Sequence, residues 1–155
     1  SASFVALCDL VYVNDLSKTF FLTPFANIGI LAEGGTSATL PIRLGWSKAA
    51  EALLLSKRIS GQDLQNAGLV NKHYGGKFKT AEEFNSTVLG ELLDATENLH
   101  VDSILQNKEL LKQIYKPAIS MVNSQEVSRG VYKWTSGIPK DRFKKLASGE
   151  LKHKL

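Results

Sequence analysis

A single carboxylate, Glu33, is the residue of this 155-residue chain that is best placed to do chemistry. It follows an almost wholly apolar approach, residues 22–32, and two glycines and a helix-like run come directly after it. Apolar surroundings disfavour the charged form of a carboxylate, so the group becomes a better proton acceptor near neutral pH. We therefore interpret Glu33 as a general base and the rest of the chain as its scaffold.

A purely structural role for Glu33 is the alternative. Acidic residues just before a helix commonly stabilise the positive end of the helix dipole and take no part in catalysis. Position in the sequence alone favours this structural role, because carboxylates with strongly altered acidity are a minority. Both interpretations remain open on the residues themselves.

The elements that must position Glu33 follow from hydrophobic patterning and from turn and cap residues. Short strands are predicted at residues 8–13, 19–22 and 69–70. Helices are predicted over residues 1–7 (the end of a buried helix), 36–44, 48–55, 61–67, 81–93, 103–114, 117–136 and 140–146. The front third is thus mixed and the remainder almost wholly helical. Two or three short strands are too few for a stable sheet, so we expect them to need partners from outside this chain.

Composition narrows the class of protein. The chain is 43% hydrophobic and 22% charged, as in soluble globular proteins, and no apolar run is long enough to span a membrane. The single cysteine, Cys8, excludes an internal disulfide and fits a reducing compartment. The N-terminus has no starting Met and no secretory pattern, and we expect the chain to begin midway through a longer protein.

Two classes of ligand are not predicted. The net charge is +4 and the basic residues gather near the C-terminus, but signatures of nucleic-acid binding are missing. His73, His100 and His153 are scattered without metal-ligand spacing, so no metal site is predicted. Tyr132 and Trp134 are interpreted as core or subunit-contact residues rather than as ligand stackers.

Two runs of residues resemble the crotonase superfamily, which includes enoyl-CoA hydratases and isomerases. The specific part is the pairing of Thr-Pro-Phe at 23–25 with Glu-Gly-Gly at 33–35. Further matching positions are 6–12, 21–22, 29–30, 36, 40–41, 45, 59–63 and 67–70. Within the superfamily the chain looks most like peroxisomal enoyl-CoA isomerases, strongly up to about Val70 and weakly beyond.

The resemblance implies a fold class: an incomplete α/β crotonase (ClpP/crotonase-like ββα spiral) with a C-terminal helical trimerisation region. Residues 1–75 would be the C-terminal part of the spiral core and residues 76–150 the helical oligomerisation region. Residues 151–155 would be a targeting tail. A homotrimer or hexamer is the implied assembly.

The resemblance also implies a reaction in fatty acid β-oxidation that shifts a 3-enoyl-CoA double bond to give 2-trans-enoyl-CoA. Glu33 would remove a proton from carbon two and return it to carbon four, and two backbone N–H groups would hold the dienolate oxygen. In the family both donors lie upstream of this segment, so the chain alone is expected to be inactive. No cofactor is implied, since coenzyme A is part of the fatty acyl-CoA substrate.

Departures from the family pattern indicate the subclass. Hydratases of the superfamily use two carboxylates to activate water, and the two corresponding positions here are Ser3 and Phe25. Water addition is therefore expected to be poor and isomerisation to be favoured. An enoyl-CoA hydratase and a non-catalytic acyl-CoA-binding or assembly fragment remain the alternatives.

The C-terminus carries two further implied sites. Phe143 and Lys144 fall where crotonases often close the acyl-CoA site with a C-terminal helix, which makes them candidate substrate contacts. His153, Lys154 and Leu155 resemble the Ser-Lys-Leu peroxisomal address. This tail implies peroxisomal localisation and an import receptor as a partner.

Overall fold

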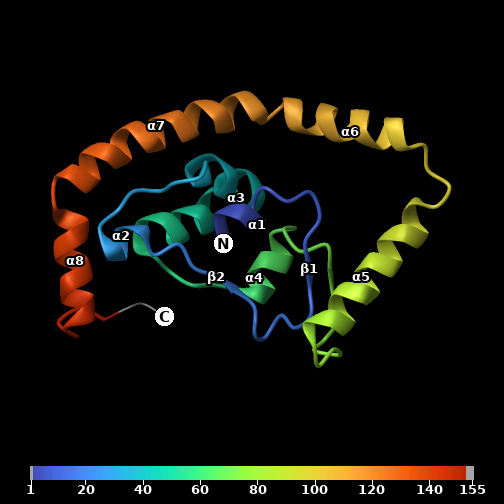
Figure 1. The fold of residues 1–155 in the computed structure, drawn as a ribbon, viewed down its shortest axis with the longest axis horizontal. Helices are drawn as coiled ribbons and strands as arrows, with labels where there is room; N and C mark the ends of the chain where they lie inside the picture. The colour runs from blue at the N-terminus through green and yellow to red at the C-terminus, as the bar shows by residue number, and fades with distance from the viewer. Residues whose placement is uncertain (1, 153–155) are drawn as a thin grey trace.

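The computed structural model describes residues 2–152 and shows a small mixed core with the long C-terminal helices arching around it (Figure 1). The core elements are α1 (Ala2–Val5), β1 (Tyr12–Val13), β2 (Phe20–Phe21), α2 (Phe25–Ile28), α3 (Thr36–Leu55), β3 (Ile59–Ser60), α4 (Gly61–Asn66) and β4 (Lys72–His73). The arch consists of α5 (Ala81–Thr96), α6 (Val101–Gln113), α7 (Lys116–Thr135) and α8 (Ile138–Ala147). The predicted division into a mixed front part and a helical remainder is confirmed.

The strands form two separate pairs. β1 pairs in parallel with β4, with Tyr12 opposite Lys72 and Val13 opposite His73. β2 pairs antiparallel with β3. Each sheet of the described residues has two strands, which is too few to be stable without cover from other elements.

The strand predicted at residues 69–70 is wrong in position. Leu69 and Val70 are buried in the core but are not paired as a strand, and β4 begins only at Lys72. The reason lies in Asn71, whose N–H donates to the Val11 carbonyl at 2.8 Å while its Oδ1 accepts from Val11 N at 2.8 Å. This double contact fixes where the parallel pairing with β1 starts.

Local signals placed α3 and α4 correctly. The two helices predicted on either side of Gly45 are joined into α3, and Gly45 (φ 75°, ψ 161°) forms the kink between them. Ser60 caps α4, because its Oγ accepts a hydrogen bond from Asp63 N at 3.1 Å. Such a cap satisfies a backbone N–H that has no partner within its own helix.

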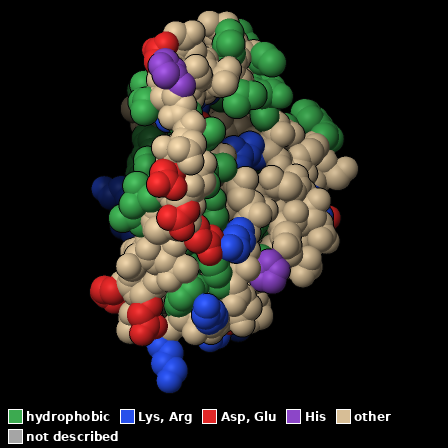
Figure 2. Space-filling view, turned by 90° about the vertical axis from the view of Figure 1, so that its right-hand side faces the viewer, with side chains coloured by type: hydrophobic (Ala, Val, Ile, Leu, Met, Phe, Trp, Pro, Cys, Tyr) green, Lys and Arg blue, Asp and Glu red, His purple; other side chains and the backbone are tan. Residues whose placement is uncertain are grey.

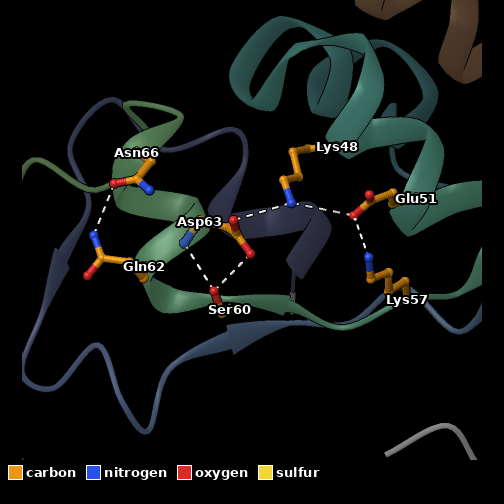
Figure 3. A network of polar contacts seen from close by, with 7 residues as sticks. All are labelled: Lys48, Glu51, Lys57, Ser60, Gln62, Asp63 and Asn66. Atoms are coloured by element: carbon orange, nitrogen blue, oxygen red, sulfur yellow. Dashed lines mark hydrogen bonds and ion pairs between the residues drawn. The ribbon is translucent and has the colours of Figure 1, made fainter.

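A polar network joins the second half of α3 to α4 (Figure 3). Lys48 Nζ lies 3.2 Å from Asp63 and 3.5 Å from Glu51, and Lys57 Nζ lies 3.1 Å from Glu51. The partly exposed contact between Lys48 and Asp63 connects the two helices. Ser60 completes the network by donating its hydroxyl to Asp63 at 2.9 Å.

The hydrophobic core lies entirely in the front part of the chain. Its buried members are Ala6, Val11, Val13, Phe21, Leu40, Leu44, Ala49, Ala52, Ile59, Leu64, Leu69 and Val70. The prediction of a buried helix at residues 1–7 is confirmed as a helix, α1, but wrong in its burial. Phe4 is 73% exposed, because no element of residues 2–152 covers that side of α1.

Few side chains of helices α5–α8 are buried. Glu126 and Pro139 are the buried residues of α5–α8 within the described range. Tyr132 and Trp134 are exposed, so they are not core residues of this chain. Figure 2 looks onto the α5 side and shows hydrophobic side chains at the surface beside a row of acidic ones. Among residues 2–152 no helix is both long enough and apolar enough to cross a bilayer.

Candidate functional site

The loop that carries Glu33 connects α2 to α3 and ends in two residues with left-handed backbone conformation. Gly34 has φ +70° and Gly35, the N-cap of α3, has φ +73°. Only glycine adopts these angles without steric cost, which explains the Gly-Gly pair directly after Glu33. The pair turns the chain sharply from the loop into the helix.

The loop is held between α1 and α7. A Cβ on Gly34 would lie 3.4 Å from Ser3 Cβ, and a Cβ on Gly35 would lie 3.0 Å from Ile119 Cγ2. Thr36, which is fully buried, donates its hydroxyl to the Glu33 carbonyl. The backbone around Glu33 is therefore fixed by residues from both ends of the chain.

Glu126 of α7 makes the principal polar contact with this loop. Its carboxylate accepts hydrogen bonds from Gly35 N at 2.7 Å, from Ser37 N at 2.8 Å and from the Ser37 hydroxyl at 2.6 Å. Glu126 is only 8% exposed and forms no ion pair among the described residues. Its charge is thus stabilised by backbone N–H groups at the positive end of the α3 dipole.

The Glu33 side chain itself is exposed. The expectation of a poorly solvated carboxylate is wrong within residues 2–152, because none of the elements present packs over that side of the loop. Its carboxylate has no hydrogen bond or ion pair within the described part of the chain. The structural alternative, Glu33 as the charge complement of α3, receives no support here, since Glu126 occupies that place.

The positions of the two hydratase acids can be located relative to this loop. Ser3 is half-buried, and its Oγ lies 3.5 Å from Thr36 Oγ1. Phe25 is buried at the start of α2. Ser3 therefore adjoins the loop of Glu33, and neither position supplies a carboxylate.

The candidate substrate contacts Phe143 and Lys144 are on α8, and within residues 2–152 no hydrogen bond, ion pair or ring contact joins them to the Glu33 loop. Phe143 stacks on Trp134 with ring centroids 6.2 Å apart, and Lys144 is exposed. The helix is anchored by Arg142, whose Nε donates to the Asn27 carbonyl at 2.6 Å. The predicted targeting tail, His153, Lys154 and Leu155, lies outside the described residues.

Other charged groups join the arch to the core. Asp9 lies 2.9 Å from Lys108 Nζ and 3.1 Å from Lys112 Nζ, and the hydrogen bond from Lys108 is the main reason that the pKa of Asp9 is lowered. Glu91 accepts from Lys72 Nζ and from the Tyr74 hydroxyl, and burial followed by the Glu91 contact raises the pKa of Tyr74. No group of three or more metal-ligating side chains comes together within residues 2–152.

Glu126 was missed by the sequence interpretation, although one signal pointed to it. Ile119, Val122 and Glu126 are spaced by three and four residues, so they share one face of α7. That face turns toward α3, whereas the apolar residues Met121, Val127 and Val131 are exposed. A carboxylate on the inward face of a helix needs a partner, but the sequence does not name that partner.

The comparisons with known proteins agree with one another. The sequence profile described as "Enoyl-CoA hydratase/isomerase" matches residues 2–77. A 3,2-trans-enoyl-CoA isomerase of Saccharomyces cerevisiae is 38% identical over 156 residues, covering 100% of this chain and 55% of the relative. A Delta(3,5)-Delta(2,4)-dienoyl-CoA isomerase of Pyricularia oryzae is 41% identical over 160 residues, covering 100% of this chain and 56% of the relative.

The solved structures extend the likeness to the fold. The crystal structure of an enoyl-CoA hydratase/isomerase from Pseudoalteromonas atlantica superposes with a TM-score of 0.82 over 99% of this chain, at 20% identity. The superposed region is 59% of the Pseudoalteromonas chain. The chain thus spans little more than half the length of the proteins that it matches.

Proposed function

Because this chain belongs to the enoyl-CoA hydratase/isomerase family, we propose that Glu33 is the base of an enoyl-CoA isomerase that converts 3-enoyl-CoA into 2-trans-enoyl-CoA. The predicted fold class, an incomplete α/β crotonase with a C-terminal helical region, is confirmed. One observation carries the proposal. The Glu33 carboxylate has no partner in the described residues, although it lies beside the start of α3, because the backbone N–H groups there donate to Glu126.

The proposed reaction needs one base and no exchange of atoms with water. Glu33 takes a proton from carbon two, which is acidified by the thioester carbonyl, and the electron pair spreads over a dienolate. The protonated carboxyl then gives the same proton to carbon four, so the double bond moves to carbons two and three. A carboxylate without structural hydrogen bonds is free to reach both carbons.

The activity is proposed for a full-length protein in which a further N-terminal segment precedes residue 1. That segment would supply two backbone N–H donors for the dienolate oxygen, a contribution that is often the largest single catalytic effect in such reactions. It would also cover Glu33, which is exposed here. The 155-residue chain alone is therefore expected to show no turnover.

A second candidate is a dienoyl-CoA isomerase, because the Pyricularia relative bears that name. A shift from a 3,5-diene to a 2,4-diene moves a proton from carbon two to carbon six. That distance exceeds the reach of one carboxylate and calls for a second acid. Ser3 and Phe25 supply none within the described residues, so the 3-enoyl substrate is favoured. Incubation of the full-length protein with each substrate decides between them, because only the 2,4-dienoyl product has its diene conjugated with the thioester carbonyl.

The remaining expectations concern assembly and location. We propose a homotrimer or hexamer for the full-length protein, with Phe143 and Lys144 near the acyl-CoA once the assembly is complete. We propose peroxisomal import through His153, Lys154 and Leu155. A fluorescent protein that ends in these three residues should enter peroxisomes, and replacement of Leu155 by Asp should leave it in the cytosol.

Replacement of Glu33 by Gln in the full-length protein tests the proposed base. The amide keeps the size of the side chain but does not accept the proton, so turnover of 3-enoyl-CoA should fall by about 10²–10⁴-fold. Binding of the substrate, measured by calorimetry, should change little. The matched control is Glu109→Gln on the exposed face of α6, which should leave turnover unchanged.

Three results would contradict parts of this proposal. Wild-type turnover in Glu33→Gln would exclude Glu33 as the base. Hydration that exceeds isomerisation in the wild-type protein would favour the hydratase alternative. Acyl-CoA binding without any turnover in the full-length protein would favour the non-catalytic alternative.

A further inference from the structure

Helix α3 begins with backbone donors that its own sequence does not satisfy. Its N-cap is Gly35, which has no side chain, and its first turn contains no acidic residue. The first N–H groups of any helix need acceptors from elsewhere, and the helix dipole makes an anion the favoured acceptor. Two carboxylates are candidates for this role, Glu33 from two residues upstream and Glu126 from α7.

The contacts settle which carboxylate takes the role. Glu126 accepts from Gly35 N and Ser37 N with a separate oxygen for each, at 2.7 and 2.8 Å. The Ser37 hydroxyl adds a third donor at 2.6 Å. Because Glu126 already binds these donors, they do not hydrogen-bond Glu33. The Glu33 carboxylate therefore has no hydrogen-bond partner among the described residues.

The same residue fixes the backbone next to Glu33. Gly35 is held on one side by its N–H bond to Glu126 and approached by Ile119 from the same helix. Errors of about 1 Å in the position of a catalytic group cost on the order of a hundredfold in rate. Glu126 is buried and fixes the backbone two residues from the proposed base, so its loss is expected to lower the reaction rate.

We propose that Glu126 is a positioning residue of the reaction: it occupies the donors at the start of α3, and so keeps the Glu33 carboxylate free and its loop in register. This inference rests on the proposed role of Glu33 as the base. Without Glu126, Glu33 turns toward the vacated N–H groups and its loop loses its register.

The test uses Glu126→Gln in the full-length protein, with Glu109→Gln as the control for loss of one helical charge. Gln keeps the size of the side chain and one acceptor oxygen but loses the charge. We expect kcat to fall about tenfold to a hundredfold with KM nearly unchanged.

A milder variant keeps the test valid if Glu126→Gln folds poorly. Ser37 is exposed, so Ser37→Ala removes only one hydrogen bond to Glu126 at little risk to the fold. It should lower kcat by a smaller factor, again with KM nearly unchanged. The fraction of folded protein is measured by circular dichroism for every variant.

The outcomes separate the inference from the proposed function. If Glu33→Gln abolishes turnover but Glu126→Gln behaves like Glu109→Gln, the positioning role is overturned and the function stands. If Glu126→Gln loses kcat only in proportion to the fraction of unfolded protein, Glu126 is merely structural. If Glu33→Gln keeps full turnover, both proposals fall.

Discussion

Ser3 of α1 and Thr36 at the start of α3 face each other beside the Glu33 loop, with their hydroxyl oxygens 3.5 Å apart. The contact joins the first described helix to the residue that follows the two glycines. It also identifies Ser3 as the position from which a second side chain would reach the surroundings of Glu33.

Ser3→Glu should shift the chemistry of the full-length protein from isomerisation toward hydration. A second carboxylate beside Glu33 supplies the acid that water activation needs. Product ratios from chromatography measure the change. Ser3→Gln is the control, and an equal ratio in both variants would contradict the prediction.

Gly35→Ala should destabilise the protein by about 1–3 kcal/mol, the usual cost of a left-handed backbone in a residue other than glycine. The new Cβ would also lie 3.0 Å from Ile119 Cγ2. Gly90→Ala in α5 is the matched control, because a Cβ there meets nothing within 4 Å. It should stabilise the helix by about 0.5–1 kcal/mol. Urea denaturation measures the free energy of unfolding of both variants. A change of the same sign in both would contradict the prediction.

Asp9→Asn should remove a stabilising contribution that depends on pH. Contacts with Lys108, and then with Lys112, lower the pKa of Asp9 in the folded state. The stabilisation is therefore present above the unfolded-state pKa of about 3.9 and is lost as the pH falls through the lower folded value. Exposed ion pairs contribute at most about 1 kcal/mol, and less in salt.

Unfolding free energies of wild type and Asp9→Asn at neutral pH and near pH 3, in low salt, check this prediction. The difference between the two proteins should shrink in acid. In a background that carries both Lys108→Gln and Lys112→Gln, the effect of Asp9→Asn should nearly vanish. An undiminished effect there would show that the ion pairs are not its source.

The sequence predicted those parts of the fold that are decided locally. The cap at Ser60, the kink at Gly45 and the start of α5 at Thr80 each depend on residues within one turn of helix. Short-range geometry is sufficient to specify such features. The helical segments of the arch were predicted for the same reason, to within a few residues at their ends.

The candidate site was predicted only in part, because its contacts are not local. Glu33 and the two glycines are recognisable in the sequence, whereas Glu126 reaches Gly35 across 91 positions. The burial expected for Glu33 depends on cover that residues 2–152 do not contain. The misplaced strand at 69–70 has a similar cause, since the Asn71 contacts with Val11 span 60 positions.

The 91-residue separation between Gly35 and Glu126 also sets an order of events during biosynthesis. A ribosome releases α3 long before it has translated α7. The start of the nascent helix therefore lacks its acceptor, Glu126, until α7 has packed against α3. Termination before residue 126 would remove the carboxylate that binds the first N–H groups of α3. The start of α3 therefore gains its acceptor only after α7 has been synthesised.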